Sequence, residues 1–332
     1  MRSLRCLGEY MQTMKTIARL ALSIVLLAAL PSLAQNWPQR PVRFIVPLGP
    51  GSGADITARL LSDSLSKMWD QPVVVENRPG ADGVIGINTV LNARDDHVLF
   101  FGPTSSIAGH PYVLDKVPYD PGQLLPLARV TNTVVCLAAP SSMPVKSLKD
   151  LVDIAQKQPG KLNWATITPM TDIILAGFAK KQNLDMAKVN YKDAVSAVND
   201  LAQERIHFYS AACAIVRGQA QAGRIRLLAV QNKTRAPSLP DVPTAAEAGF
   251  PTLTFDGLVG IIAARNAAPP DAARERIAGD VRKVVSDPQI RDKLISTVQI
   301  VAPGDGAEFA AAMQEQADIL ADFAKALGMK KN

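Results

Sequence analysis

The fold is decided by residues 42–55, which read VRFIVPLGPGSGAD. The mostly apolar run from Val42 to Val46 predicts a buried strand. A glycine-rich turn spans Gly49 to Gly53, and the segment from Asp55 to Trp69 then carries apolar residues close to helical spacing, which predicts a helix. A strand, a glycine-rich turn and a helix in this order are typical of the start of a layered α/β domain.

The same alternation continues along the chain and then starts again. It predicts two doubly wound α/β lobes, each with a parallel sheet covered by helices, followed by a largely helical C-terminal part. The length of 332 residues suffices for two domains of ordinary size. The predicted strands are residues 42–46, 73–75, 98–101, 134–138, 162–165, 206–209, 225–230 and 258–263. The predicted helices are residues 55–69, 84–91, 148–158, 170–182, 214–222, 272–285, 288–297 and 308–327.

The first 34 residues have the three-part pattern of a secretory signal peptide. Lys15 and Arg19 form a basic start, residues 20–30 are apolar and uncharged, and a small-residue cleavage site ends at Ala34. The apolar run is shorter than the roughly 20 residues that span a bilayer, which disfavours the alternative of an uncleaved membrane anchor. We therefore expect residues 1–34 to be a cleaved signal peptide and the mature protein to reside in the periplasm.

The charge balance changes once this leader is set aside. The remaining chain has 32 basic and 29 acidic residues, a net charge of +3. It contains no run of Lys or Arg, so nucleic acid is not an expected partner, and no second long apolar run suggests membrane insertion. Cys136 and Cys213 remain, and the sequence leaves open whether they form a disulfide or stay as two buried thiols.

Catalytic and metal-binding signatures are missing from the sequence. His97, His110 and His207 do not form an H-x-x-x-H or H-E-x-x-H pattern, and no C-x-x-C occurs. Ser52 lies in Gly-Ser-Gly but lacks the glycine spacing of a nucleophile elbow. We therefore predict no catalytic residue, no metal site and no cofactor.

The glycine-rich turn after the first strand is the most informative candidate site. Glycines let backbone N–H groups approach a ligand, and a helix N-terminus favours negative charge. The alternative is a helix capped by Ser52 and Asp55 with no ligand at all. A dinucleotide site is disfavoured because the glycines follow G-x-G-x-G rather than G-x-G-x-x-G, although Glu76 stands where a ribose-binding acid would. The candidate ligand-binding residues of this turn are Gly49, Pro50, Gly51, Ser52, Gly53, Ala54 and Asp55.

Three further turns lie after predicted strands or before predicted helices. Such positions are where open α/β sheets bind ligands, although each could also be an ordinary polar loop. Thr168 before Pro169 also reads as a helix N-cap followed by the first helical position. The candidate residues are Thr104, Ser105 and Ser106 in the second turn, Thr166, Thr168 and Thr171 in the third, and Asp193 and Ala194 in the fourth.

Several of these stretches together resemble a known family. Residues 45–55 resemble the V-P-x-x-P-G-G-x-x-D opening of the tripartite tricarboxylate transporter receptors, the Bug or TctC family. Residues 73–86, which read VVVENRPGADGVIG, are similar to a second family motif. Further matches occur, in the family's order, at residues 37–43, 118–121, 159–163 and 239–249.

The resemblance implies a type II periplasmic binding-protein fold in which two lobes close over a small organic anion. The implied solutes are mostly di- or tricarboxylates, amino acids or aromatic acids, and the implied partner is a two-subunit membrane permease. The anion would be held by backbone N–H groups, hydroxyls and waters from the first turn and its counterpart in the second lobe. We expect residues 35–130 and 262–332 to form lobe 1, residues 131–261 to form lobe 2, and the chain to cross near 129–135 and 258–263.

The sequence departs from the family pattern at four places. Ala54 replaces a hydroxyl residue, residues 94–97 replace a common turn, residues 167–170 replace a small glycine-containing loop, and Ser210-Ala211 replaces a frequent aromatic-Asp pair. Without that Asp, an ammonium group has no partner, and Ile167 and Met170 are expected to narrow the third turn. We therefore predict that a simple amino acid is not the ligand.

Two alternatives to a transport receptor stay open at this point. The chain could be a ligand-binding protein that feeds a periplasmic sensor, which would have a similar sequence. It could also be a periplasmic enzyme acting on a small carboxylate, which turnover of a bound ligand would reveal.

Overall fold

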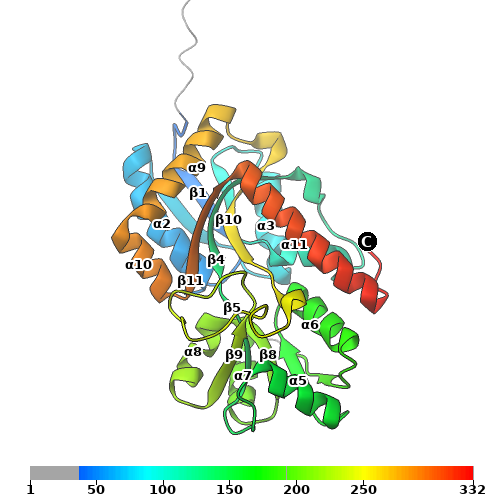
Figure 1. The fold of residues 1–332 in the computed structure, drawn as a ribbon. Coiled ribbons are helices and arrows are strands. Elements are labelled where there is room, and N and C mark those ends of the chain that lie inside the picture. Colours follow the sequence, from blue (N-terminus) through cyan, green and yellow to red (C-terminus); the bar gives the residue numbers. More distant parts are fainter. Residues whose placement is uncertain (1–36, 192, 332) are drawn as a thin grey trace, which may run out of the picture. The chain divides into compact units, whose positions relative to one another are not determined.

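Two mixed β-sheets organise the computed structural model, which describes residues 37–191 and 193–331. The first sheet has the strand order β11-β4-β10-β3-β1-β2 and the second has the order β7-β6-β8-β5-β9 (Figure 1). The strands of the first sheet are β1 (Val42–Val46), β2 (Val73–Asn77), β3 (Val98–Pro103), β4 (Leu124–Thr133), β10 (Gly257–Ala264) and β11 (Gln299–Asp305). Those of the second are β5 (Val135–Pro140), β6 (Asn163–Thr166), β7 (Ala187–Lys188), β8 (Phe208–Ala212) and β9 (Ile225–Val230).

The prediction of parallel sheets is only partly confirmed. Strand β1 pairs in parallel with β2 and β3, and β6 pairs in parallel with β7 and β8. Strands β4, β10 and β11 are antiparallel to their neighbours, and so is β5. The difference arises because β4 and β11 lie outside the strand–helix alternation from which the parallel arrangement was predicted, and because β5 and β10 are each the first strand after a passage from one sheet to the other.

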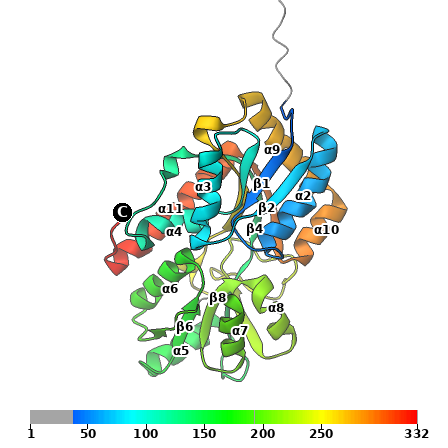
Figure 2. The same ribbon diagram turned by 180° about the vertical axis from the view of Figure 1, so that it is seen from behind.

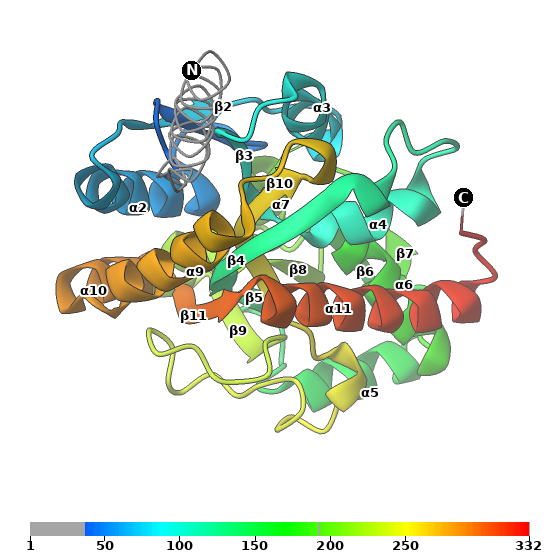
Figure 3. The same cartoon turned by 90° about the horizontal axis from the view of Figure 1, so that it is seen from above.

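Helices cover both faces of each sheet. Helices α2, α9 and α10 contact one another and the first sheet on one face, and α3, α4 and α11 lie on the other (Figure 3). Helices α5 and α6 pack in one core of the second sheet, and α7 and α8 pack in the other (Figure 2). The helices are α2 (Gly53–Trp69), α3 (Val84–Ala93), α4 (Ser105–Val113), α5 (Leu148–Lys157), α6 (Pro169–Lys181), α7 (Ala194–Ala202), α8 (Cys213–Gln221), α9 (Asp271–Ser286), α10 (Pro288–Ser296) and α11 (Gly306–Leu327). Short 3₁₀ turns are η1 (Ala81–Gly83), η2 (Pro121–Gln123), η3 (Pro251–Leu253) and η4 (Arg265–Ala267).

The passages between the two sheets lie close to the expected crossings. Strand β4 ends at Thr133 in the first sheet, and β5 begins at Val135 in the second. The chain returns through residues 231–256 before β10. The lobe boundaries expected at 131 and 262 therefore fall inside β4 and β10. The residue bounds of the two lobes therefore stay a proposal, with the crossings placed at Val134 and in 231–256.

The C-terminal helix α11 packs against both sheets. Near its start, Phe309 is fully buried in the core of the first sheet, against Gly260. Near its end, Leu320 and Phe323 belong to the core of the second sheet together with α6, where Gly177 leaves room for the Phe323 ring. One helix therefore connects the two cores, in addition to the two chain crossings.

A disulfide links Cys136 of β5 to Cys213 at the start of α8. The two Cα atoms are 5.1 Å apart, within the usual range for a bridge, and both residues are buried. The structure thus decides between the two alternatives that the sequence left open.

The division of the chain by internal contacts separates residues 1–39 from residues 40–332, and the sheets and helices above belong to the second of these units. The expected signal peptide, residues 1–34, lies outside the described residues. Within residues 37–191 and 193–331, no helix is both long enough and apolar enough to cross a membrane.

Candidate functional site

The glycine-rich first turn is organised around the buried carboxylate of Asp55. This carboxylate accepts hydrogen bonds from the Gly51 N–H at 2.9 Å, from the Asn77 amide at 2.9 Å and from the Arg59 guanidinium at 2.9 Å. Burial by itself would raise the pKa of Asp55, but the hydrogen bonds from Arg59, Gly51 and Asn77 outweigh it and lower the pKa below its usual value. Asp55 therefore holds the turn as an ionised acceptor and presents no free charge to a ligand.

Helix capping uses part, but not all, of the N–H groups in this turn. The Ser52 hydroxyl accepts from the Asp55 N–H at 3.3 Å, and the Ser52 N–H donates to the Gly49 carbonyl at 3.3 Å. The expected capping box is only half formed, because the Asp55 carboxylate bonds to Gly51 instead of to the N-cap residue. Gly53 and Ala54 are the first two helical residues, whose N–H groups have no partner within a helix, and among the described residues no other acceptor is recorded for them.

In the second turn, the hydroxyls of Thr104 and Ser106 are bonded within the protein. Thr104 is buried, and its hydroxyl donates to the Gln316 side chain of α11 at 2.7 Å. Ser106 donates to the Asp82 carboxylate at 2.9 Å, whereas Ser105 is half-buried at the start of α4. The Thr104 hydroxyl therefore fastens α4 to α11.

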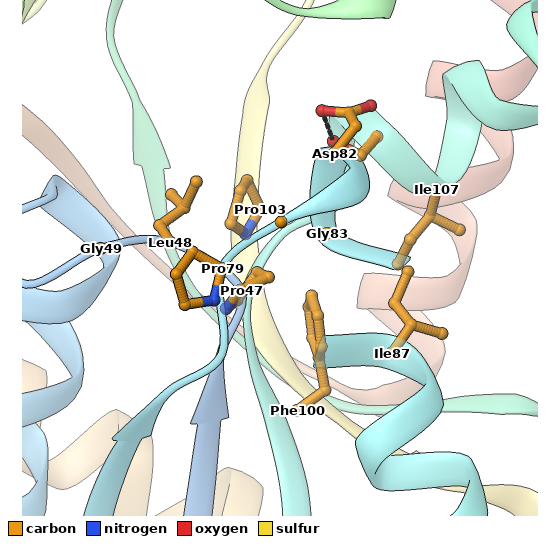
Figure 4. Close-up of a pocket in the computed structure, with 12 residues that line it drawn as sticks. Pro47, Leu48, Gly49, Pro79, Asp82, Gly83, Ile87, Phe100, Pro103 and Ile107 are labelled. Atoms are coloured by element: carbon orange, nitrogen blue, oxygen red, sulfur yellow. Dashed lines mark hydrogen bonds between the residues drawn. The ribbon is translucent and has the colours of Figure 1, made fainter. Parts of the chain in front are cut away.

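A small cavity of about 170 Å³ lies between the first and second turns, at the carboxyl ends of β1, β2 and β3 (Figure 4). Its wall is mainly apolar, and Asp82 and Ser106 provide its polar groups. The Asp82 carboxylate lies 3.3 Å from Nε2 of the buried His110, whose Nδ1 is 2.7 Å from the Tyr119 hydroxyl. The apolar lining residues are Pro47, Leu48, Pro79, Ile87, Phe100, Pro103 and Ile107.

The third turn contacts the first sheet's helix α4 instead of standing open. A Cβ atom added to Gly109 of α4 would lie 2.8 Å from the Pro169 side chain, so the two helices meet where α6 begins. The Thr166 hydroxyl donates to Asp172 at 3.2 Å, and the Thr168 and Thr171 hydroxyls bond to each other at 2.8 Å. These hydroxyls therefore form their hydrogen bonds within their own turn or with the helix that follows it.

The fourth turn has the contacts of a helix cap. The Asp193 carboxylate accepts from both the N–H (2.8 Å) and the hydroxyl (2.9 Å) of Ser196, and these bonds lower the pKa of Asp193. Ala194 is the first residue of α7 and is half-buried. The buried Tyr209 hydroxyl has no partner among the described residues, and burial, with the nearby Asp193 charge, raises its pKa.

Comparison with known proteins gives this geometry a context. A model of the tripartite tricarboxylate transporter family receptor matches residues 57–329. The chain belongs to this family. A UPF0065 protein from Bordetella bronchiseptica is 28% identical over 314 residues, covering 94% of this chain and 92% of the relative.

Solved structures agree on the fold. A structure described as a periplasmic transporter is 29% identical, with a TM-score of 0.76, and the match covers 89% of this chain and all of the other. An R. palustris protein solved with adipate is 25% identical, with a TM-score of 0.77, and the match covers 89% of this chain and 99% of the other. The family assignment and the two-lobe periplasmic binding-protein fold expected from the sequence are thus confirmed.

The departures from the family pattern have different outcomes in the structure. Met170 is fully buried in the core of the second sheet, so the expectation that its bulk narrows the third turn is wrong, whereas Ile167 is exposed. Ser210 donates to the Gln231 side chain at 2.5 Å, and Ala211 is buried, so this position carries no charged group. At residues 94–97, Arg40 donates to both oxygens of Asp95, next to Asp96 and His97. This ion pair places a positive charge beside the two carboxylates and so disfavours a metal ion there.

At the first turn and at the third turn, the basic side chain is paired with a nearby carboxylate. Arg59 is held by Asp55, and the Lys188 ammonium lies 2.5 Å from the Asp172 carboxylate. A ligand at these turns would therefore meet neutral donors. Sequence reasoning missed Asp82 and Tyr209. Asp82 lies just before the predicted helix 84–91 and inside the second family motif, but its partners Ser106 and His110 are more than 20 residues away. Tyr209 is the last residue of a predicted strand.

Proposed function

We propose that this chain is a periplasmic, non-catalytic receptor that captures a small organic carboxylate and delivers it to a two-subunit membrane permease. The observation that carries the proposal is at the start of α2, where the N–H groups of Gly53 and Ala54 have no acceptor among the residues that the structure describes. Unbonded N–H groups at a helix N-terminus attract anions because the helix dipole adds to their partial positive charge. The family to which the chain belongs is one of transport receptors.

The chemistry around the first turn favours a carboxylate with an apolar body. The cavity beside Gly49 offers the apolar side chains of Leu48, Phe100 and Ile107, and its one carboxylate, that of Asp82, is paired with His110. The R. palustris relative was solved with adipate, whose four methylene groups separate two carboxylates. We propose linear dicarboxylates of this kind, or aromatic acids, as ligands. Ser105, Ser106, Thr166, Thr168, Thr171, Asp193 and Ala194 remain proposed contacts to a ligand.

The absence of catalysis is part of the proposal. Ser106 donates its proton to Asp82 and not to an imidazole, and His110 bonds to Asp82 and Tyr119. Because no imidazole accepts from this serine, it lacks the base that usually activates a serine nucleophile.

The binding test uses four probes: adipate, succinate, citrate and benzoate. A ligand at 100 times its Kd stabilises the folded state by about 2.7 kcal/mol. For a protein of this size, that free energy raises Tm by roughly 5–10 °C. Adipamide, which has the same chain but no charge, is the matched control and should give no shift. Binding of adipamide as tight as that of adipate would contradict an anion site, and conversion of the bound acid would contradict a pure receptor.

Export and delivery need separate tests. Intact-mass measurement of the periplasmic fraction should give a mature chain that begins at Gln35, and retention of residues 1–34 would contradict cleavage. Uptake of the bound acid should require both this chain and its permease subunits. If uptake is unchanged without this chain while a transcriptional response to the acid is lost, the alternative of a sensor-feeding protein is correct.

A further inference from the structure

Gln299, the first residue of β11, is a buried amide with a fixed orientation. The residue is 2% exposed and pairs in register with Thr133, the last residue of β4. Its Oε1 accepts from the Thr131 hydroxyl at 3.3 Å and from the Thr133 hydroxyl at 3.4 Å. Because alternate residues of a strand share a face, both threonine hydroxyls lie on the same side of the amide, at its oxygen. The amide nitrogen is therefore turned to the opposite side.

That nitrogen lies against the start of α2. A Cβ atom added to Gly53 would be 2.9 Å from Nε2 of Gln299. Among the described residues, no acceptor is recorded for either N–H of this amide. Unlike the Tyr209 hydroxyl, this nitrogen is not fully enclosed, so a ligand can reach it.

At the start of α2, three donors thus lack an acceptor within residues 37–191 and 193–331: the N–H groups of Gly53 and Ala54 and the Nε2 of Gln299. We infer that Gln299 is a ligand-contacting residue, which donates with these two N–H groups to one carboxylate of the solute. A carboxylate fits because it accepts at two oxygens and donates nothing, whereas an ammonium or amide nitrogen would face donors. This inference rests on the proposed function and adds the residue that completes the first-turn site.

Gln299 lies beside the segment in which the chain passes from the first sheet to the second. Thr133 is followed by Val134, whose N–H is 3.5 Å from the Val298 carbonyl and whose carbonyl accepts from the Cys213 N–H at 2.8 Å. The residue before Gln299 therefore bonds to the crossing segment, and that segment bonds to the first residue of α8. A carboxylate held by Gln299 lies next to the point where the chain leaves the first sheet.

The test compares Gln299→Glu and Gln299→Met with wild type, using isothermal titration with whichever of the four acids binds. In Q299E, the new carboxylate accepts from the Gly53 and Ala54 N–H groups and repels the ligand. We expect its Kd to rise at least about 100-fold, while Tm of the unliganded protein stays equal or rises. In Q299M, one donor to a charged group is lost, and Kd should rise about 10- to 100-fold. Gln156→Glu, on the exposed surface of α5, adds the same charge elsewhere and should leave Kd unchanged.

The outcomes separate this inference from the proposed function. If wild type binds an acid and both Gln299 variants bind it equally well, the inference is wrong and the receptor function stands. If Q299E binds normally and is also more stable, Gln299 is only a cap for α2, which overturns the inference. If wild type binds none of the acids, the proposed function fails, and the inference fails with it.

Discussion

Replacement of Asp55 by Asn tests the role of the buried carboxylate in the first turn. The change keeps the shape of the side chain and removes its charge, so the Gly51 N–H and the Asn77 amide lose their ionised acceptor. A hydrogen bond to a charged group contributes about 1.5–3 kcal/mol. The Arg59 pair adds at most about 1 kcal/mol, because that side chain is half exposed. Since Asn keeps one acceptor oxygen, we expect Asp55→Asn to lower the free energy of unfolding by about 2–4 kcal/mol at pH 7.

The same substitution has a pH signature. The folded-state pKa of Asp55 is lower than its value in the unfolded chain, so its ionisation stabilises the fold above the unfolded pKa. This stability is lost as pH falls through the folded pKa. The difference between wild type and variant should therefore be constant from pH 7 to 5 and shrink below about pH 4.

Urea unfolding monitored by circular dichroism, at pH 7 and at half-unit steps below pH 5, measures both effects. Asp153→Asn on the exposed face of α5 is the matched control, since its pair with Lys149 lies on the surface. It should change the free energy of unfolding by less than about 1 kcal/mol. A difference below 0.5 kcal/mol for Asp55→Asn (on the order of a surface change), or one that does not shrink in acid, would refute the reasoning.

Three further substitutions test other features of the structure. Gly53→Ala should weaken carboxylate binding about 10-fold in titration, because the new Cβ displaces the Gln299 amide. Tm of the unliganded protein should stay equal or rise. Unchanged binding would count against the first-turn site. Gly177→Ala places a Cβ within 2.5 Å of the Phe323 ring and should cost about 1–3 kcal/mol in urea unfolding, a loss that would be missing if α11 did not pack on α6. Replacing Cys136 and Cys213 together by Ala removes the bond that closes a loop of 77 residues and should lower the free energy of unfolding by about 4 kcal/mol. If the variant and the oxidised wild type had the same free energy of unfolding, that result would argue against the bridge.

The parts of the fold with strong local patterns could be predicted from the sequence. The apolar run of β1 and the spacing of α2 place both elements within about two residues of their observed bounds. Strands β4 and β11 were not predicted as strands, because Pro126 and Pro303 interrupt them and their pairings contain register shifts. Their edge and crossing positions depend on partners far away in the sequence.

The candidate site was predictable only where local backbone geometry decides it. The glycine-rich turn before α2 was found, since capping and helix N–H groups are local features. The Thr104 hydroxyl donates to the Gln316 side chain, and this hydrogen bond could not be predicted because Gln316 is remote in the sequence. For the same reason Gln299 gave no signal: only the pairing of β11 with β4 brings its amide next to Gly53.

Helix α11 has a consequence for how a solute leaves. Two crossing segments alone would let the sheets swing apart by bending, as a hinge does. Because Leu320 and Phe323 attach α11 to the core of the second sheet, the two sheets can separate only if these side chains leave that core. Exposing each side chain to water costs about 1.5–3 kcal/mol. The rate at which a bound solute is released would then depend on the strength of the contact between the C-terminal turns of α11 and α6.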